Sequence, residues 1–102
     1  MGSEKFIKYL SANYNFDNIK YTLYSDQWPK LEVNLNPIDL VKLVSAEHNL
    51  ENIIRKCELT SNENHRFNSD IIGTTRMNLV KNTLIIQGSE IVIQLFIKKV
   101  FT

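Results

Sequence analysis

Few residues in this chain could act as a catalytic nucleophile and its base. Cys57 is the single cysteine, and the histidines are His48 and His65. A catalytic thiol needs a base or a cation close by to hold it as a thiolate, and no spacing here matches a nucleophile motif. Cys57 falls on the apolar side of an expected helix, where a free cysteine usually packs as a small core residue. We therefore expect Cys57 to be buried and inert.

Metal binding would need three or four ligands at workable spacing. One grouping offers suitable donors: His48, Glu51, Cys57 and His65. The chain has neither a Cys-x-x-Cys pair nor a His-Glu-x-x-His pattern, which are spacings that make such a grouping specific. We interpret His48 as a solvated residue at a helix end, and we expect no metal and no cofactor.

The sequence also shows no motif for acid–base catalysis or for phosphate binding. Asp26 with Glu32, or Glu58 with Glu63, could supply a pair of carboxylates. Their positions, however, are typical of solvated strand faces and loops. The 3 glycines are isolated, so the chain has no glycine-rich loop to cradle a phosphate. The sequence therefore predicts no catalytic residue and a protein that is not an enzyme.

The composition is that of one globular domain over residues 1–102. The chain is 43% hydrophobic and carries 12 Lys+Arg against 11 Asp+Glu. Near-zero net charge is untypical of a dedicated nucleic-acid-binding protein, whose binding face is strongly basic. The lone cysteine, and the lack of an apolar run long enough to cross a bilayer, favour a soluble, cytoplasmic protein without a membrane partner.

Two features of the composition bear on origin. The Gly2-Ser3 pair is typical of a cloning remnant, which would extend over residues 1–3 of the domain. The abundance of Asn, Ile and Lys is typical of AT-rich coding, as in an AT-rich bacterium, one of its phages or a mobile element.

The first third of the chain predicts a helix and a hairpin. Apolar residues at helical spacing mark a helix over 4–13, and they are Phe6, Ile7, Leu10 and Tyr14. β-Branched and aromatic residues predict a strand over 20–25, and a turn over 26–29 leads to a second strand. In that second strand Leu31, Val33 and Leu35 alternate with polar residues, so one face should be buried and the other wet.

Asn36 to Asp39 form the clearest helix start in the chain. Asn36 suits the N-cap, Pro37 suits the first helical position, and Asp39 complements the helix dipole. We expect a buried stripe along this helix, formed by Ile38, Val41 and Val44 and widened by Leu40 and Leu43. Helical spacing returns over 50–59, and both a break near Asn49 and one long bent helix fit the pattern.

A polar loop is expected over 60–70, and the β pattern returns after it. Strands over 74–80 and 83–87 are followed by a Gly88-Ser89 turn and a last strand over 90–101. That last strand has apolar residues on both faces, which favours a central position or a face covered by a partner. The order, α-β-β-α(α)-β-β-β, predicts an α+β domain with a four- to five-stranded, mainly antiparallel sheet and two or three helices on one face.

Two clusters are candidates for contact with a partner. Aromatic side chains gather around the first hairpin, and aromatic residues are enriched at protein interfaces. Polar and basic side chains gather in the 60–70 loop, and cations of the strands after it could extend them into a basic edge. The candidate contacts are Tyr24, Trp28, Asn64, His65, Arg66 and Arg76.

The lack of catalytic motifs favours a non-catalytic protein that binds another protein and blocks its surface. Small inhibitors, immunity proteins, antitoxins and phage anti-defence proteins are of this kind. The first alternative is a nucleic-acid-binding module that uses a sheet face or the basic edge. The second is a subunit that completes an active site with a partner chain, and its candidate residues are His65, Arg66 and Asp70. A homodimer through a sheet edge is compatible with each of these functions.

Overall fold

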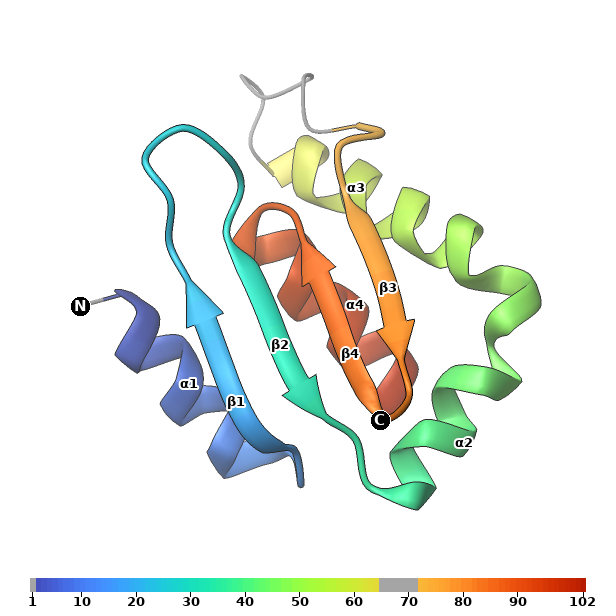
Figure 1. The fold of residues 1–102 in the computed structure, drawn as a ribbon. Helices are drawn as coiled ribbons and strands as arrows, with labels where there is room; N and C mark the ends of the chain where they lie inside the picture. Colours follow the sequence, from blue (N-terminus) through green and yellow to red (C-terminus); the bar gives the residue numbers. More distant parts are fainter. Residues whose placement is uncertain (1, 65–71) are drawn as a thin grey trace.

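The computed structural model describes residues 2–64 and 72–102, which build one antiparallel sheet and the helices beside it (Figure 1). The helices are α1 (Gly2–Asn13), α2 (Pro37–Ser45), the short 3₁₀ helix η1 (Glu47–Asn49), α3 (Leu50–Asn64) and α4 (Glu90–Phe101). The strands are β1 (Asp17–Thr22), β2 (Lys30–Asn34), β3 (Arg76–Val80) and β4 (Thr83–Gln87). Within the described ranges, no helix is long and apolar enough to cross a membrane.

The four strands lie in the order β1-β2-β4-β3, and each neighbouring pair is antiparallel. β1 and β2 are joined by the loop over 23–29, and β3 turns into β4 through Lys81 and Asn82. Lys81 has a φ of 57°, the left-handed conformation that such a tight turn requires. The pairing of β2 with β4 joins these two hairpins, so the predicted antiparallel sheet is confirmed.

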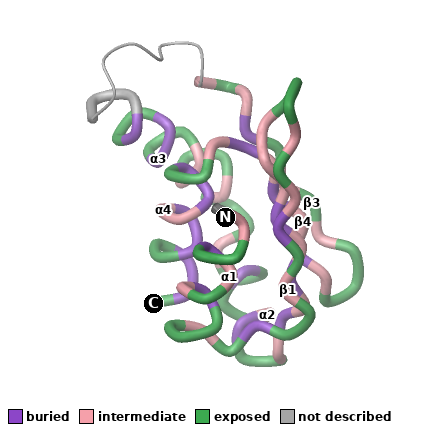
Figure 2. The backbone as a smooth tube through the Cα atoms, turned by 90° about the vertical axis from the view of Figure 1, so that its left-hand side faces the viewer, coloured by how far each residue is buried: buried purple, intermediate pink, exposed green. Residues whose placement is uncertain are grey.

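The sheet has one apolar face and one polar face, because side chains alternate along each strand. The apolar side chains form two rows across the strands, Tyr21–Leu31–Ile86–Met77 and Val33–Leu84–Leu79. The helices α1, α3 and α4 cover this side of the sheet, and the opposite side is open (Figure 2). The core therefore lies between the sheet and one layer of helices, as the sequence predicts.

In the N-terminal half, the structure largely agrees with the elements predicted from the sequence. In α1, Phe6 and Leu10 are buried and Ile7 is half-buried against the core, as expected. The first strand, expected over 20–25, instead runs from Asp17 to Thr22. Asn18, whose φ is 50°, lies in a bulge where the register with β2 shifts, and this bulge lets the polar segment join the strand.

The segment 90–101 is helix α4 and not the strand that the sequence predicts. Ser89 caps it, since the Ser89 hydroxyl accepts the Val92 N–H at 3.2 Å, so the expected Gly88-Ser89 hairpin turn is also wrong. The buried side chains recur at helical spacing: Val92, Ile93, Phe96, Ile97, Val100 and Phe101. Burial of these side chains outweighs the local β preference of a segment rich in Ile, Val and Phe. The sheet consequently has four strands, and the described chain has four α-helices where two or three were expected.

The break near Asn49 is present. α2 ends at Ser45, η1 turns the chain, and α3 begins at Leu50. α3 continues to Asn64, so the expected loop over 60–70 is wrong for residues 60–64, and residues 65–70 lie outside the described residues. The extension follows from packing, because Ser61 is buried on the same side of α3 as Cys57 and Glu58.

Candidate protein-interaction site

The apolar stripe expected on the buried side of α2 lies on its exposed side. Ile38, Val41 and Val44 are 71%, 64% and 51% exposed, whereas Leu43 is 2% exposed. The buried side of α2 carries Asp39 and Leu43 and packs against α4. The sequence pattern allowed either orientation, because apolar residues occur around the whole helix.

Local hydrogen bonds set this rotation of α2. The Asn36 side chain accepts the Asp39 N–H at 2.8 Å, which fixes the helix start, and its amide donates to the Asp39 carboxylate at 3.1 Å. Lys42 donates to the backbone carbonyl of Phe101 in α4 at 3.3 Å. The polar groups of α2 are thereby turned toward the body of the protein.

We define the α2 outer face as Ile38, Val41 and Val44. These residues follow one another at helical spacing and lie on one side of the helix. The Lys42 ammonium beside them is directed toward α4 and toward Asp39, 3.9 Å away, so it does not place charge over this face. A helix that is apolar on both sides is typical of one covered on both sides. The α2 outer face is therefore an apolar surface suited to a partner.

Other exposed aliphatic side chains are scattered. Leu23 lies in the β1–β2 loop, Leu59 on α3, Val80 on β3 and Ile91 on α4. Single exposed aliphatic residues are ordinary on protein surfaces. Three of them on one face of a nine-residue helix are not, and this sets α2 apart from the other described elements.

The predicted aromatic contacts are both partly engaged within the protein. Tyr24 is half-buried, and the Lys30 ammonium lies over its ring, 5.9 Å from the centroid. Trp28 is half-buried against the core, and its carbonyl accepts from the Gln87 side chain at 2.8 Å. Both residues lie in the loop at the end of the sheet opposite α2 (Figure 1). Their contact with a partner stays a prediction.

Of the predicted polar contacts, Arg76 and Asn64 are described, and they lie at that same end. Arg76 is exposed at the start of β3, where it donates to the carbonyls of Gly73 at 2.7 Å and Thr75 at 3.2 Å. Asn64 is the last residue of α3, and His65 and Arg66 lie outside the described residues. Arg76 pairs with Gln87 of β4, and Gln87 pairs with Lys30 of β2 and donates to Trp28, so Arg76 lies in the same row across the sheet as residues that contact the aromatic loop.

The polar groups buried in the described chain serve the fold. Cys57 is buried, as predicted, and loss of solvation raises the pKa of its thiol more than the Lys99 charge lowers it. The thiol is therefore protonated at neutral pH and a weak nucleophile. Among the residues that the structure describes, no group of three or more His, Cys, Asp or Glu side chains could hold a metal ion.

Comparisons with protein-family models, curated proteins and solved structures found no match. Function has therefore to be inferred from the residues themselves. The α2 outer face is the exposed surface that differs most from an ordinary solvated one, and sequence reasoning assigned its residues to the core. The signal that could have revealed it is the excess of apolar residues in 37–45 over what one buried side can hold.

Proposed function

We propose that this chain is a non-catalytic protein that binds a partner protein through the α2 outer face and blocks the surface it covers. The observation that carries the proposal is the exposure of Ile38, Val41 and Val44 together on one helix. Full burial of an aliphatic side chain of this size contributes about 1.5–3 kcal/mol. Three such side chains in one contact are enough to act as the anchors of an interface.

The partner that fits this face is a different protein with an apolar groove. Helix-in-groove recognition uses apolar anchors spaced along one side of a short helix, as Ile38, Val41 and Val44 are. Pairing α2 with α2 of a second copy would bury only a few side chains from each nine-residue helix. That is far below the roughly 1,200 Å² that a stable interface needs. A groove that receives the exposed side of the helix buries more area around the same three anchors.

Blocking follows from size and position. α2 lies at one end of the sheet and packs against α4, so a partner that covers the exposed side of α2 must also meet the neighbouring surface of the domain (Figure 1). A rigid domain held there excludes other ligands from the partner's groove. The chain needs no catalytic group for this action.

A pair of matched variants tests the proposal. Val44 on α2 and Val80 on β3 are the same residue type and are 51% and 50% exposed. The wild type, Val44→Lys and Val80→Lys would be immobilised and exposed to lysate of the source cells, with and without nuclease treatment. A captured protein would be identified, purified and titrated against each variant. We expect one partner whose Kd rises at least tenfold with Val44→Lys and stays unchanged with Val80→Lys.

The other outcomes overturn the proposal. Equal effects of both substitutions would mean that the α2 outer face is not the contact. Capture that disappears on nuclease treatment would favour the nucleic-acid alternative, because it depends on a bridging nucleic acid. A wild type that is dimeric by light scattering, and monomeric as Val44→Lys, would make a second copy the occupant of this face.

A further inference from the structure

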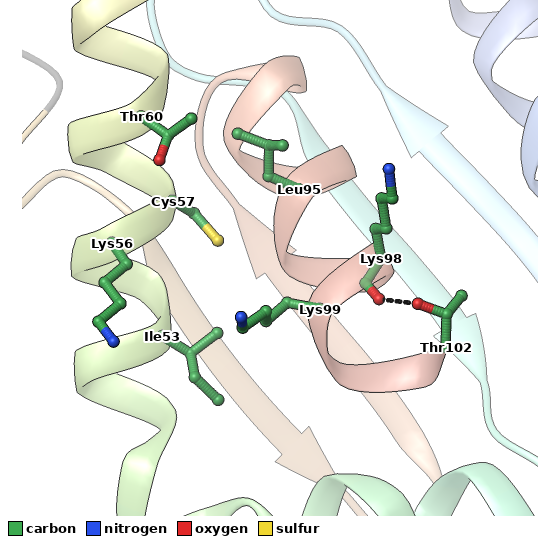
Figure 3. A pocket seen from close by; sticks show the side chains of 8 residues that line it. All are labelled: Ile53, Lys56, Cys57, Thr60, Leu95, Lys98, Lys99 and Thr102. Atoms are coloured by element: carbon green, nitrogen blue, oxygen red, sulfur yellow. Dashed lines mark hydrogen bonds between the residues drawn. The ribbon is translucent and has the colours of Figure 1, made fainter.

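A groove with a volume of about 610 Å³ lies between α3 and α4 (Figure 3). Its residues come from both helices: Ile53, Lys56, Cys57, Thr60, Leu95, Lys98, Lys99 and Thr102. It shares no residue with the α2 outer face. A volume of this size is within the range of small-molecule sites.

Residues of both helices face each other across the groove. Cys57 and Thr60 of α3 point toward α4, and Leu95 of α4 points toward α3 (Figure 3). Ile53 and Leu95 give the floor an apolar character, and the aliphatic stems of the lysines extend it.

The rim of the groove is positively charged. Lys56 comes from α3, whereas Lys98 and Lys99 come from α4. The ion pairs between described side chains are Lys42 with Asp39 and Arg55 with Glu58, so these three lysines have no described carboxylate within 4.0 Å. Lys98 and Lys99 complement the α4 dipole. That reason does not apply to Lys56, which is in the middle of α3.

The charge of Lys99 reaches the inside of the groove. Its side chain extends across the opening toward Ile53, and the Cys57 sulfur points from α3 toward α4 (Figure 3). The same charge opposes the effect of burial on the pKa of the Cys57 thiol. An anion placed over the apolar floor would therefore meet an ammonium group at the rim.

We propose that the α3–α4 groove binds a small amphiphilic anion. The apolar body of the ligand lies on Ile53, Cys57 and Leu95, and its carboxylate or phosphate head meets Lys56 and Lys99. A groove with an apolar floor and charged groups at its rim suits an amphiphilic anion. The proposal does not depend on the partner-binding function of α2.

Titration with short-chain amphiphiles tests the head group. Octanoate and octyl phosphate, each below its micelle-forming concentration, would be titrated by isotope-edited NMR into the intact chain, with octyl glucoside and octylammonium as neutral and cationic probes. We expect binding of at least one anion, weakening with added salt because exposed charges are screened. Comparison of the two anions distinguishes a carboxylate from a phosphate ligand. Equal binding of the neutral probe, or binding of no anion, would overturn the proposal.

Two lysine variants locate the site. Lys99→Met removes the charge and keeps the apolar stem, and we expect it to weaken anion binding at least tenfold. Lys8→Met makes the same change at an exposed lysine of α1, outside the groove, and should leave the affinity unchanged. Thermal melting of both variants checks that each is folded. An affinity unaffected by Lys99→Met in the folded protein would overturn the assignment of the site.

Chemical shifts supply a second readout inside the groove. Binding of octanoate or octyl phosphate should shift the backbone amide signals of Ile53, Cys57 and Leu95 in the wild type. The double variant Lys56→Met/Lys99→Met should show no such shifts at the same ligand concentration. Shifts confined to other parts of the chain would place the ligand elsewhere on the protein and overturn the proposal. None of these results depends on whether a protein partner is captured.

Discussion

Thr75 donates two hydrogen bonds to one carboxylate oxygen of Glu58, from its backbone N–H at 3.1 Å and from its hydroxyl at 2.8 Å. The other oxygen accepts the Gly73 N–H at 2.9 Å and lies 3.6 Å from the Arg55 Nε. Glu58 is 1% exposed. A buried carboxylate is tolerable when donors surround it, and here the donors come from the segment that leads into β3. Glu58 thus ties α3 to one edge of the sheet.

Removing this carboxylate should destabilise the fold. Glu58→Ala leaves the two donors of Thr75 buried without their acceptor and removes the acceptor of the Gly73 N–H, and we expect the free energy of unfolding to fall by about 3 kcal/mol. Thr75→Val removes one hydrogen bond and should cost about 1 kcal/mol. Urea denaturation measures both. Glu51→Ala, at an exposed position of the same helix, is the control and should change stability by less than about 0.5 kcal/mol. A similar small effect of Glu58→Ala would contradict this account.

Tyr21 should make stability fall at alkaline pH. Its hydroxyl donates to the Glu90 carboxylate at 3.0 Å. Burial, then this hydrogen bond and the charge of Glu90, raise the pKa of Tyr21 above its ordinary value of 10.0. The native state therefore holds the phenolic proton more tightly than the unfolded state does. The resulting stability is complete below pH 10 and is lost as pH rises beyond it.

Tyr21→Phe tests this dependence. At pH 7 we expect a cost of about 1 kcal/mol for the lost hydrogen bond. Over about two pH units above the ordinary tyrosine pKa of 10.0, the variant should lose stability less steeply than the wild type. Urea denaturation at several pH values measures the two slopes. Parallel slopes would mean that Tyr21 does not contribute to the alkaline transition.

The two sides of α2 should respond oppositely to truncation. Leu43→Ala removes a fully packed side chain and should cost about 2–5 kcal/mol. Val41→Ala removes exposed atoms and replaces a β-branched residue by a better helix former, so stability should change by less than about 0.5 kcal/mol or rise slightly. Thermal or urea unfolding distinguishes these cases. A large loss with Val41→Ala would show that the outer face is covered in the isolated protein.

Removing the N-cap of α4 should lower the stability of the fold. Ser89→Ala removes the acceptor of the Val92 N–H, and loss of such an N-cap costs about 1 kcal/mol. Ser45→Ala, at an exposed position at the end of α2, is the matched control with an expected change below about 0.5 kcal/mol. Equal stability of the Ser89 variant and the wild type would mean that packing alone starts α4.

Local sequence signals predicted those elements in which a single periodicity, or a helix cap, fits the residues. The alternation in β2, the stripe of Phe6 and Leu10 in α1 and the Asn36 cap of α2 are all present. Each of these patterns is compatible with one periodicity only. The sequence therefore sufficed to predict an α+β domain with an antiparallel sheet.

The residues 90–101 show where such reasoning fails. Apolar residues there satisfy the strand period through Ile91, Ile93 and Leu95, and the helix period through Val92, Ile93 and Phe96. The abundance of Ile, Val and Phe in this segment favoured the strand. Tertiary burial decides between the periods, and the length of 12 residues together with the Ser89 cap was the available sign of a helix.

The candidate site was missed for a related reason. In α2 every turn offers apolar residues to two opposite sides, so periodicity alone does not say which side is buried. The choice depends on Lys42 reaching Phe101 and on Leu43 packing against α4, and both contacts join parts of the chain that are far apart in sequence. The α3–α4 groove likewise depends on which residues of two separate helices face each other.

The position of β2 within the sheet also affects how the chain is made. One neighbour, β1, directly precedes β2 in the chain. The other neighbour is β4, and Asn34 of β2 pairs with Thr83 of β4, which is 49 positions further along the sequence. Closing so long a loop costs conformational entropy before any contact offsets it. During synthesis the first hairpin therefore leaves the ribosome with Leu31 and Val33 facing water and with one edge of β2 unpaired. The interval before β4 emerges is the period when this protein is most exposed to wrong strand pairing and in greatest need of a chaperone.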